Sequence, residues 1–488
     1  MLFNSYIFIF VFLPITLLLY FGFNKIKKYK IAKLVLVIAS LYFYAYFNVK
    51  YLFIIVSSIL INYLFNRIFR KLKNKNFRKI LLIIGVAFNI GMIFYYKYYD
   101  FVISTINSLA STNFNLINVM LPLGISFFTF QQMAYVIDSY KGEVKDYTLL
   151  DYSLFVTFFP QLIAGPITLY SEMIPQFEDE NNKHFNSENF SKGLLAFSFG
   201  LAKKVLIADT FAIAANYVFA NPTDTNSTNL ILGMLSYTFQ IYFDFSGYCD
   251  MALGLGYMFN IKLPINFNSP YKSHSVVEFW KRWHMTLTRF FTTYIYIPLG
   301  GSRKGKIRTY INVFIVFLAS GIWHGANFTF ILWGILHGIA SILNRIFKNV
   351  IEKTNEVFNW ICTFLFINFT WVIFRADSIS DAFNIIKHIL KLNFGPISSD
   401  ITSAFALPEL TTFMDLFGKK AWIAENYNTL YLLIFFVFAF FAILCMKNTQ
   451  ERVEEFKPNA KNAVISAILL VMSIISLSGV STFLYFNF

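Results

Sequence analysis

Long apolar runs separated by short polar segments repeat along almost the whole of this sequence. A helix needs roughly 17 to 25 mostly apolar residues to cross the hydrocarbon core of a membrane. Runs of about this length occupy 6–23, 31–49, 51–66, 80–96, 116–138, 194–220, 229–258, 310–343, 358–374, 429–446 and 463–486. Because the run 310–343 is long enough to cross twice, the pattern predicts an all-α polytopic membrane protein with roughly 11 to 13 spans.

Three segments depart from this pattern. Pro160 and Pro166 interrupt the run 153–170, and since proline removes a backbone donor, we expect a re-entrant or broken helix buried against protein. The segment 259–309 is the least hydrophobic part of the central region, and its paired tryptophans favour a helix at the membrane surface. The stretch at 381–391 predicts a surface helix with an apolar face made of Phe383, Ile386, Ile389 and Leu390.

The polar segments between the runs are strongly basic. Only 14% of the residues are charged, yet the net charge is +15. Basic residues concentrate in 25–33, 67–79, 303–308 and 345–348, and by the positive-inside rule these loops are cytoplasmic and the N-terminus lies outside. Because no nucleic-acid-binding motif accompanies these charges, no nucleic-acid partner is expected. No repeat or flexible linker divides the chain, so residues 1–488 are expected to form a single domain surrounded by membrane lipids.

The double-length run contains two histidines of chemical interest. Cations flank 310–343 on both sides, so both ends are expected on the cytoplasmic side and the run forms a hairpin. Gly325 and Asn327 weaken the helix near its middle, which places His324 deep in the protein at the bend and His337 on the returning arm. A neutral imidazole suits proton transfer near pH 7, so His324 is a candidate general base or nucleophile. A packing histidine bonded to a helix carbonyl fits the same position, and both interpretations stay open.

Two carboxylates interrupt another apolar run. Asp244 and Asp250 lie within YFDFSGYCDMALG, and a carboxylate in a membrane helix is costly unless it is paired. We expect both to face the interior, where they orient a histidine or pair with Arg282 or Arg289; a purely structural ion pair is an equal alternative. Their separation of six residues puts them on different helical faces, which argues against a two-carboxylate hydrolase site.

His284, Lys203 and Lys204 are the other polar residues in apolar surroundings. From local sequence alone, His284 is more typical of an interfacial histidine among aromatic and cationic neighbours. The two lysines could face the interior or snorkel towards the membrane surface.

Several chemistries lack their motifs. The sequence contains no phosphate-binding G-x-x-x-x-G-K-[ST] loop, no dinucleotide fingerprint, no H-E-x-x-H and no G-x-S-x-G, which disfavours ATP hydrolysis, dinucleotide redox chemistry and zinc proteolysis. Cys249, Cys362 and Cys445 are widely spaced in apolar surroundings and are predicted to be packing residues. No metal and no tightly bound cofactor are therefore expected.

Several ordered stretches together resemble a known family. They are LPLGISFFTFQQMAYVIDSYKGEV at 121–144, FFPQLIAGPI at 158–167, YFDFSGYCDMALGLG at 242–256, NFNSPYKSHSVVEFWKRWHMTLTRFF at 266–291, YIPLGGSRKGKIRTYINVF at 296–314 and GIWHGANFTFILWGILHG at 321–338. With the opening MLFNSYIFIFVFLP and FTWVIFRADSISDAF at 369–383, this set closely resembles the membrane-bound O-acyltransferase family over nearly the whole chain. The resemblance is greatest to the branch that O-acetylates alginate, peptidoglycan and exopolysaccharides, and weaker to the D-alanyl transfer protein of teichoic acid modification.

The resemblance implies a ring of membrane helices, with re-entrant and interfacial helices, around a thinned centre where a funnel reaches a buried histidine from both sides. His324 matches the family's active-site histidine in its WHG motif, and His284 matches the second histidine-bearing position. Thr286 and Thr288 follow this second histidine where the acetylating branch more often has serines, and either hydroxyl can donate a hydrogen bond. Residues expected to contact the substrate are Asp244, Trp323, Asn327, Arg282 and Asn268.

The implied reaction is acyl transfer from a thioester, acetyl-CoA, that approaches from the cytoplasm. By charge alone, its phosphates could be held by Arg303, Lys304, Lys306 and Arg308. His324 would deprotonate an acceptor hydroxyl arriving from the opposite side, with His284 orienting the acceptor or polarising the carbonyl. A covalent acyl-histidine is an alternative.

The related systems pass the acetyl group to an extracytoplasmic acetyltransferase that modifies a glycan. The resemblance therefore implies such a partner or acyl-acceptor protein, a polysaccharide or peptidoglycan as final acceptor, and a location in the bacterial cytoplasmic (inner) membrane. A transporter or flippase is the competing class, although no internal repeat typical of transporters is visible. A non-catalytic subunit of a polysaccharide export assembly is a second alternative.

Overall fold

The chain folds almost entirely into helices. The computed structural model describes residues 1–406, 420–477 and 481–484, and these contain no β-strand. The first helices are α1 (Leu13–Lys25), α2 (Tyr29–Ala45), α3 (Lys50–Lys71), α4 (Lys75–Ile93), α5 (Tyr99–Ala110), α6 (Ile125–Lys141), α7 (Leu149–Thr157), α8 (Phe159–Leu162), α9 (Tyr170–Glu178), α10 (Ser187–Ala202), α11 (Asp209–Ala220) and α12 (Ser227–Met258). They are followed by α13 (Val276–Arg282), α14 (Met285–Phe291), α15 (Lys306–His324), α16 (Phe328–Ile346), α17 (Lys348–Ile351), α18 (Glu356–Arg375), α19 (Ile379–Leu390), α20 (Ser399–Thr402), α22 (Lys420–Leu444), α23 (Thr449–Glu454) and α24 (Ala460–Ile475).

This architecture confirms an all-α polytopic membrane protein. Within the described residues, six helices are long and apolar enough to cross a membrane: Phe8–Lys25, Lys50–Lys71, Lys75–Ala110, Lys306–His324, Phe328–Ile346 and Glu356–Arg375. Several other apolar helices are shorter, such as α2 with 17 residues, so the total of roughly 11 to 13 spans stays a prediction. Of the last predicted run, 463–486, residues 478–480 and 485–486 lie outside the described part of the chain.

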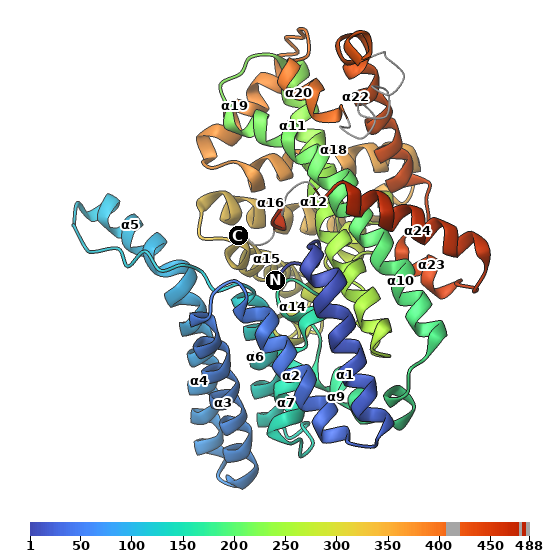
Figure 1. Ribbon diagram of the computed structural model, residues 1–488. Coiled ribbons are helices and arrows are strands. Elements are labelled where there is room, and N and C mark those ends of the chain that lie inside the picture. The colour runs from blue at the N-terminus through green and yellow to red at the C-terminus, as the bar shows by residue number, and fades with distance from the viewer. Residues whose placement is uncertain (407–419, 478–480, 485–488) are drawn as a thin grey trace.

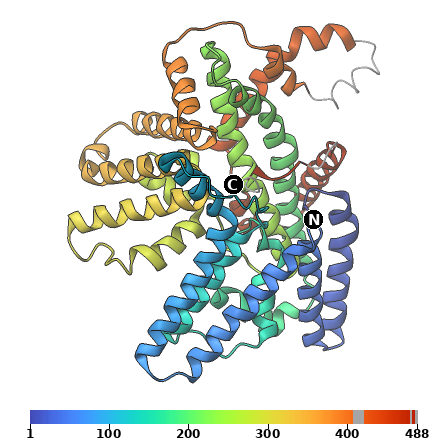
Figure 2. The same cartoon turned by 90° about the vertical axis from the view of Figure 1, so that its left-hand side faces the viewer.

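The helices surround a centre formed by α12, and the hairpin of α15 and α16 extends from this centre to the edge of the molecule (Figure 1 and Figure 2). Helices α3 and α4 lie on one side of the molecule, and α10, α23 and α24 lie on the other. Helix α12 is 32 residues long and is buried along most of its length, because α10, α11, α18 and α19 pack against it. The long apolar run 229–258 is therefore a central helix covered by protein.

Two of the predicted runs depart from a single regular α-helix. Residues 112–122 have no helical structure, and α6 begins only after Pro122 and Gly124, whose φ of 68° is in the left-handed region. A Cβ at Gly124 would lie 2.8 Å from the carbonyl oxygen of Leu162, so this turn packs directly against α8. The run 194–220 comprises α10, the π-helical segment Lys203–Ala208 and α11.

The run 153–170 is a broken, buried helix, as predicted. Helix α7 ends at Thr157, α8 contains Pro160 near its start, and the chain beyond α8 stays non-helical as far as α9. Every residue from Leu154 to Thr168 is buried.

Two predictions for surface helices are wrong in detail. The segment 259–309 does not form a surface helix, because Trp280 on α13 and Trp283 directly after it are 7% and 1% exposed and pack within an aromatic cluster. In α19, the buried face consists of Ala382, Ile385 and Ile389, whereas Phe383 is 56% exposed. Among the cysteines, all of which are free, Cys249 is buried as a packing residue, but Cys362 and Cys445 are exposed.

The predicted hairpin is confirmed and is held by close glycine contacts. Helices α15 and α16 pack against each other, and residues 325–327 form the bend (Figure 2). A Cβ at Gly321 would lie 2.5 Å from the carbonyl oxygen of Phe330, and one at Gly334 would lie 2.6 Å from that of Phe317. The two backbones therefore approach more closely than any larger residue would permit.

Gly334→Ala is accordingly expected to push the hairpin arms apart and to destabilise the protein by roughly 1 to 3 kcal/mol, the usual cost of overpacking. The thermal unfolding midpoint of the purified protein in detergent measures this effect. Gly91→Ala is the matched control, since a Cβ there would meet nothing within 4 Å. Equal midpoints for the two variants would show that the contact has room to relax.

Candidate active site

His324 is the last residue of α15 and lies at the bend of the hairpin. Its side chain is buried among three aromatic rings, with centroid distances of 4.9 Å to Trp323, 5.1 Å to Trp333 and 5.2 Å to Phe374. The next residue, Gly325, has an extended backbone, and a Cβ there would lie 2.1 Å from the ring of Phe330. The glycine therefore lets the chain turn directly after the histidine.

A lysine holds the end of the helix that carries His324. The ammonium group of Lys97 donates hydrogen bonds to the carbonyl oxygens of Trp323 at 2.7 Å and His324 at 2.8 Å. Carbonyls in the last turn of a helix lack partners within the helix, and a cation also suits the negative end of the helix dipole. Lys97 was not predicted, because it directly follows the apolar run 80–96. The structure places it inside one continuous helical segment, Lys75–Ala110, so a lone cation within a span was the available signal.

His284 is buried close to the same tryptophan. Its ring centroid lies 6.0 Å from that of Trp323 and 4.9 Å from that of Phe245. His284 has φ 45° and ψ 52°, a left-handed conformation that is uncommon for a residue with a side chain and that occurs often at functional sites. The interfacial interpretation of this residue is therefore wrong.

Asn266 fixes the orientation of the His284 ring. The Oδ1 atom of Asn266 accepts hydrogen bonds from Thr286 Oγ1 at 2.6 Å and from the Thr286 amide at 3.2 Å, and it lies 3.3 Å from His284 Nδ1. Since Oδ1 is an acceptor, Nδ1 carries the proton in this arrangement. His284 lies outside the six candidate spans. Because burial lowers the pKa of His284 to about 3, its ring is neutral at physiological pH.

His337 is held by hydrogen bonds on both ring nitrogens. Trp280 Nε1 donates to His337 Nδ1 at 3.0 Å, and His337 Nε2 lies 3.0 Å from Thr370 Oγ1, which itself donates to the Ile367 carbonyl. These bonds join α13, α16 and α18. His337 therefore links three helices, whereas His324 ends one.

Asp244 and Asp250 pair with lysines and not with the predicted arginines. Lys204 Nζ donates to Asp244 Oδ1 at 2.7 Å, and Lys203 Nζ donates to Asp250 Oδ2 at 2.6 Å. Packing of the segment Lys203–Ala208 along α12 brings these partners together across 40 or more residues of sequence. Arg282 instead pairs with Glu278 and Arg289 with Glu172.

A short C-terminal segment completes the Asp244 pair. The amide of Leu484 donates to Asp244 Oδ2 at 2.9 Å, and Lys204 also donates to the carbonyl of Thr482 at 3.1 Å and to Asp209 Oδ1 at 2.8 Å. The side chains of Lys204 and Asp244 are only 2% and 4% exposed. Two buried charges are thereby neutralised and fully hydrogen-bonded.

Two cavities are each lined in part by the hairpin that carries His324, although His324 itself lines neither. The first, the Asp244 cavity, measures about 670 Å³ and is polar; its lining includes Lys204, Asp209, Gln240, Asp244, Asn327, Phe330, Phe374 and Arg375. The second, the Trp280 cavity, measures about 400 Å³; its lining includes Trp280, Lys281, Ser302, Phe317, Ser320 and Arg345. Phe374, which lines the Asp244 cavity, contacts the His324 ring, and Ser320, which lines the Trp280 cavity, lies about one helical turn before His324 on α15.

The other predicted contact residues have diverse positions. Asn327 lines the Asp244 cavity, but its side chain also caps α16 by accepting from the Thr329 amide. Arg282 and Asn268 bond to each other and line neither cavity. The four basic residues predicted to hold the donor phosphates also line neither cavity. They are exposed in the turn before α15 and at the start of that helix: Arg303, Lys304, Lys306 and Arg308. Lys281 and Arg345 are the cations that line the Trp280 cavity.

The model of the membrane-bound O-acyltransferase family matches residues 80–379. This range includes His284, His324 and the residues of α12–α16 that line the two cavities. The chain belongs to the membrane-bound O-acyltransferase family. It is similar to the peptidoglycan O-acetyltransferase of Helicobacter pylori, with 39% identity across 100% of this chain and 98% of that protein. The probable alginate O-acetylase AlgI of Pseudomonas aeruginosa is 39% identical over 79% of this chain and 74% of its own. The teichoic acid D-alanyltransferase of Bacillus subtilis is 29% identical over 50% of this chain and 63% of its own.

These findings make the protein a multi-pass membrane O-acyltransferase. In this membrane-bound O-acyltransferase, Lys97→Met should remove two hydrogen bonds from the end of α15 and loosen His324. Hydrogen bonds to a charged group contribute about 1.5 to 3 kcal/mol, so a comparable loss of positioning would lower kcat roughly 10- to 100-fold.

Initial rates of acyl transfer by the purified protein measure this effect of Lys97→Met. Lys97→Arg, which keeps a cationic donor, should recover much of the rate, whereas recovery by Lys97→Gln to the same extent would contradict a role for the charge. Lys79→Met, a substitution of an exposed lysine at the start of the same segment, is the control.

Proposed function

We propose that this protein transfers an acetyl group from cytoplasmic acetyl-CoA to an extracytoplasmic acceptor, in the bacterial cytoplasmic membrane, for O-acetylation of a polysaccharide or peptidoglycan. The observation that supports the proposal is that residues next to His324 line two separate cavities, Phe374 the Asp244 cavity and Ser320 the Trp280 cavity. A donor and an acceptor that approach from opposite sides can meet only at such a point.

The Trp280 cavity is the better candidate for the donor. Lys281 and Arg345 line it, and the basic segments 303–308 and 345–348 that adjoin it are cytoplasmic by the positive-inside rule. Cations at the rim suit the phosphates of a coenzyme A thioester, while Trp280, Phe291 and Phe317 provide an apolar path towards His324. This assignment replaces Arg303 and its three basic neighbours with Lys281 and Arg345 as the nearest phosphate contacts.

The Asp244 cavity is the better candidate for the acceptor. Its lining contains carboxylate, amide and guanidinium groups from Asp209, Gln240, Asn327, Arg375 and Asp377, which suit hydroxyl-rich or polypeptide acceptors. Asp244 itself is already bonded to Lys204, so its part in acceptor binding is to hold the wall of the cavity in place.

The chemistry assigned to His324 is general base catalysis. A neutral imidazole nitrogen takes the proton from the acceptor hydroxyl as the oxygen attacks the thioester carbonyl. The tetrahedral intermediate then expels the thiolate of coenzyme A, which takes up the proton from the imidazolium, so a C–O bond replaces the C–S bond. His284, fixed by Asn266 and adjacent to Trp323, polarises the carbonyl or orients the acceptor.

A partner protein completes the proposal. The first acceptor hydroxyl belongs to an extracytoplasmic acetyltransferase or acyl-acceptor protein, which passes the acetyl group to the glycan. Support for glycan O-acetylation comes from the two relatives that are 39% identical, whose names specify peptidoglycan and alginate.

Reconstituted protein tests this function against transport. Full-length protein in liposomes receives radiolabelled acetyl-CoA on one side and the purified acceptor protein on the other, and we expect covalent label on the acceptor with equimolar release of coenzyme A thiol. Label that crosses without forming a covalent bond would identify a transporter. Transfer from a different acyl thioester but not from acetyl-CoA would contradict the proposed donor.

A further inference from the structure

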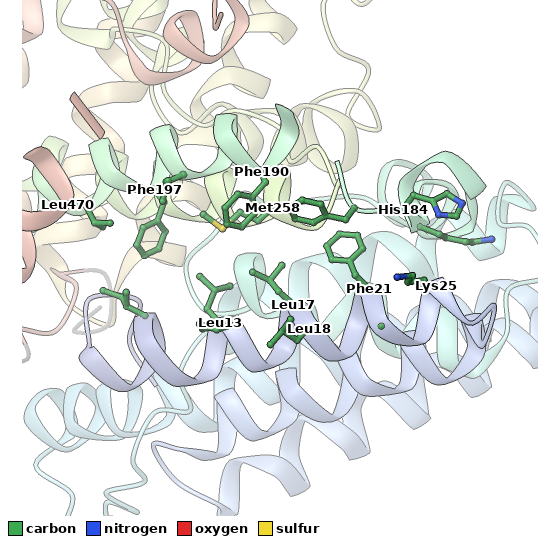
Figure 3. Close-up of a pocket in the computed structure, with 16 residues that line it drawn as sticks. Leu13, Leu17, Leu18, Phe21, Lys25, His184, Phe190, Phe197, Met258 and Leu470 are labelled. Carbon is green, nitrogen blue, oxygen red and sulfur yellow. The ribbon is translucent and has the colours of Figure 1, made fainter. Parts of the chain in front are cut away.

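A long apolar groove lies between α1 and α10 (Figure 3). Its volume is about 860 Å³, larger than either cavity beside His324. Helix α1 contributes Leu13, Leu17, Leu18 and Phe21, and the facing wall consists of Phe190, Leu194, Phe197, Met258 and Leu470. None of these residues belongs to the site of acyl transfer.

The groove has a charge at one end only. Lys25 and His184 lie together at that end, while Phe197 and Leu470 lie at the other (Figure 3). Lys183, which precedes His184 in the sequence, also lines the groove. Among the described residues that line the groove there is no carboxylate. Lys183 stacks over the ring of Tyr29, with its ammonium 4.2 Å from the ring centroid, so this cation is held at the mouth of the groove without an acidic partner there.

The groove is long enough to hold an acyl chain of one leaflet. Its lining residues from Ile9 to Gly22, on the π-helical segment Phe8–Phe12 and on α1, span roughly 20 Å of helix, whereas one leaflet contributes about 15 Å of a hydrocarbon core ~30 Å thick. The basic end adjoins the segment 25–33, which the positive-inside rule places in the cytoplasm. The cytoplasmic leaflet is also the one that carries anionic lipids.

We propose that this groove binds one phospholipid with an anionic headgroup from the cytoplasmic leaflet. The headgroup and phosphate lie between Lys25 and Lys183, and an acyl chain lies along Leu13, Leu17 and Phe190 towards Phe197. Burial of the chain provides most of the affinity, because exposed lysines alone bind a free phosphate only weakly. The bound lipid joins α1 to α10 and so braces the helix pair that supports α12.

Filling the groove tests whether it is the lipid site. Full-length protein in neutral detergent is incubated with phosphatidylglycerol, and retained lipid is measured by native mass spectrometry. Gly22→Phe is the blocking variant, since a Cβ at Gly22 meets nothing within 4 Å and the ring can enter the groove without disturbing the helix. Gly91→Phe, on an equally open helical glycine of α4, is the matched control.

We expect one retained phosphatidylglycerol in the wild type and in Gly91→Phe, and a loss of roughly tenfold in Gly22→Phe. Unchanged retention in Gly22→Phe would overturn the proposal. So would displacement of the lipid by inorganic phosphate at millimolar concentration, because that result would identify a site for the anion alone.

Charge substitutions test the preference for an anionic headgroup. Lys25→Gln combined with Lys183→Gln should lower retention of phosphatidylglycerol roughly fivefold for each lysine, with little change for phosphatidylcholine. Lys30→Gln removes an exposed cation of the same loop that does not line the groove, and should leave both lipids unaffected. Equal retention of the two lipids by the wild type would contradict selection by charge. Acyl transfer does not enter these measurements, so their outcome is independent of the proposed function.

Discussion

His324→Gln is expected to lower the rate of acyl transfer roughly 10²- to 10⁴-fold while the protein stays folded. Glutamine retains a polar side chain of similar reach but cannot take a proton from a hydroxyl group. The ring it replaces packs against Trp333 and Phe374, so the variant must be shown to elute as a monodisperse species and to unfold near the wild-type temperature. Single-turnover transfer of radiolabelled acetyl groups gives the rate of the chemical step.

His274→Gln is the matched control for this experiment. The side chain of His274 is 46% exposed, so its replacement should disturb the packing of the protein little. We expect it to transfer at the wild-type rate. A folded His324→Gln protein that transfers at that same rate would exclude His324 as the base. A covalently acylated wild-type protein, trapped without acceptor and absent from His324→Gln, would instead favour the acyl-histidine route.

Lys204→Met is expected to have the largest effect on stability. The substitution leaves Asp244 as an uncompensated charge, and breaking a buried ion pair in this way costs about 3 to 5 kcal/mol. Adding Asp244→Asn to Lys204→Met removes the stranded charge and should restore part of the loss. The midpoint of thermal unfolding in detergent measures all three proteins.

Lys192→Met is the control for the buried pair, since Lys192 forms an ion pair with Glu188, whose side chain is 56% exposed. Exposed pairs of this kind contribute about 0 to 1 kcal/mol, so its midpoint should stay close to that of the wild type. If Lys204→Met were no less stable than Lys192→Met, water would have to enter the Asp244 cavity and solvate the carboxylate.

The hydrophobic pattern predicted where helices form but not which helices and side chains pack against one another. The hairpin bend at residues 325–327 followed from Gly325, Asn327 and the flanking cations, because these features are local. The partners of Asp244 did not follow, because Lys204 reaches it only after α10 and α12 have packed together, and no spacing rule links residues 40 positions apart. The burial of Trp283 was missed for a similar reason, since an indole beside cations has the same local pattern at a membrane surface and in an aromatic core.

The two histidines of the candidate site were predicted, but the residues that hold them in position were not. Resemblance identified His324 and His284, and the structure places both rings beside Trp323. Lys97 and Asn266, which hold the backbone at His324 and the ring of His284, were not singled out. Both act through hydrogen bonds to other residues, and hydrogen-bond partners in a helical protein are chosen by tertiary packing and not by sequence periodicity.

The bond from the Leu484 amide to Asp244 has a consequence for synthesis. The two residues are 240 positions apart, and at about 5 to 20 residues per second a ribosome needs roughly 10 to 50 s to add that length of chain. Until that length has been added, Asp244 lacks the Leu484 amide and Lys204 lacks the Thr482 carbonyl. The part of the Asp244 cavity wall formed by residues 481–484 is therefore synthesised after α11, α12, α16 and α18, which contribute the other parts of that wall.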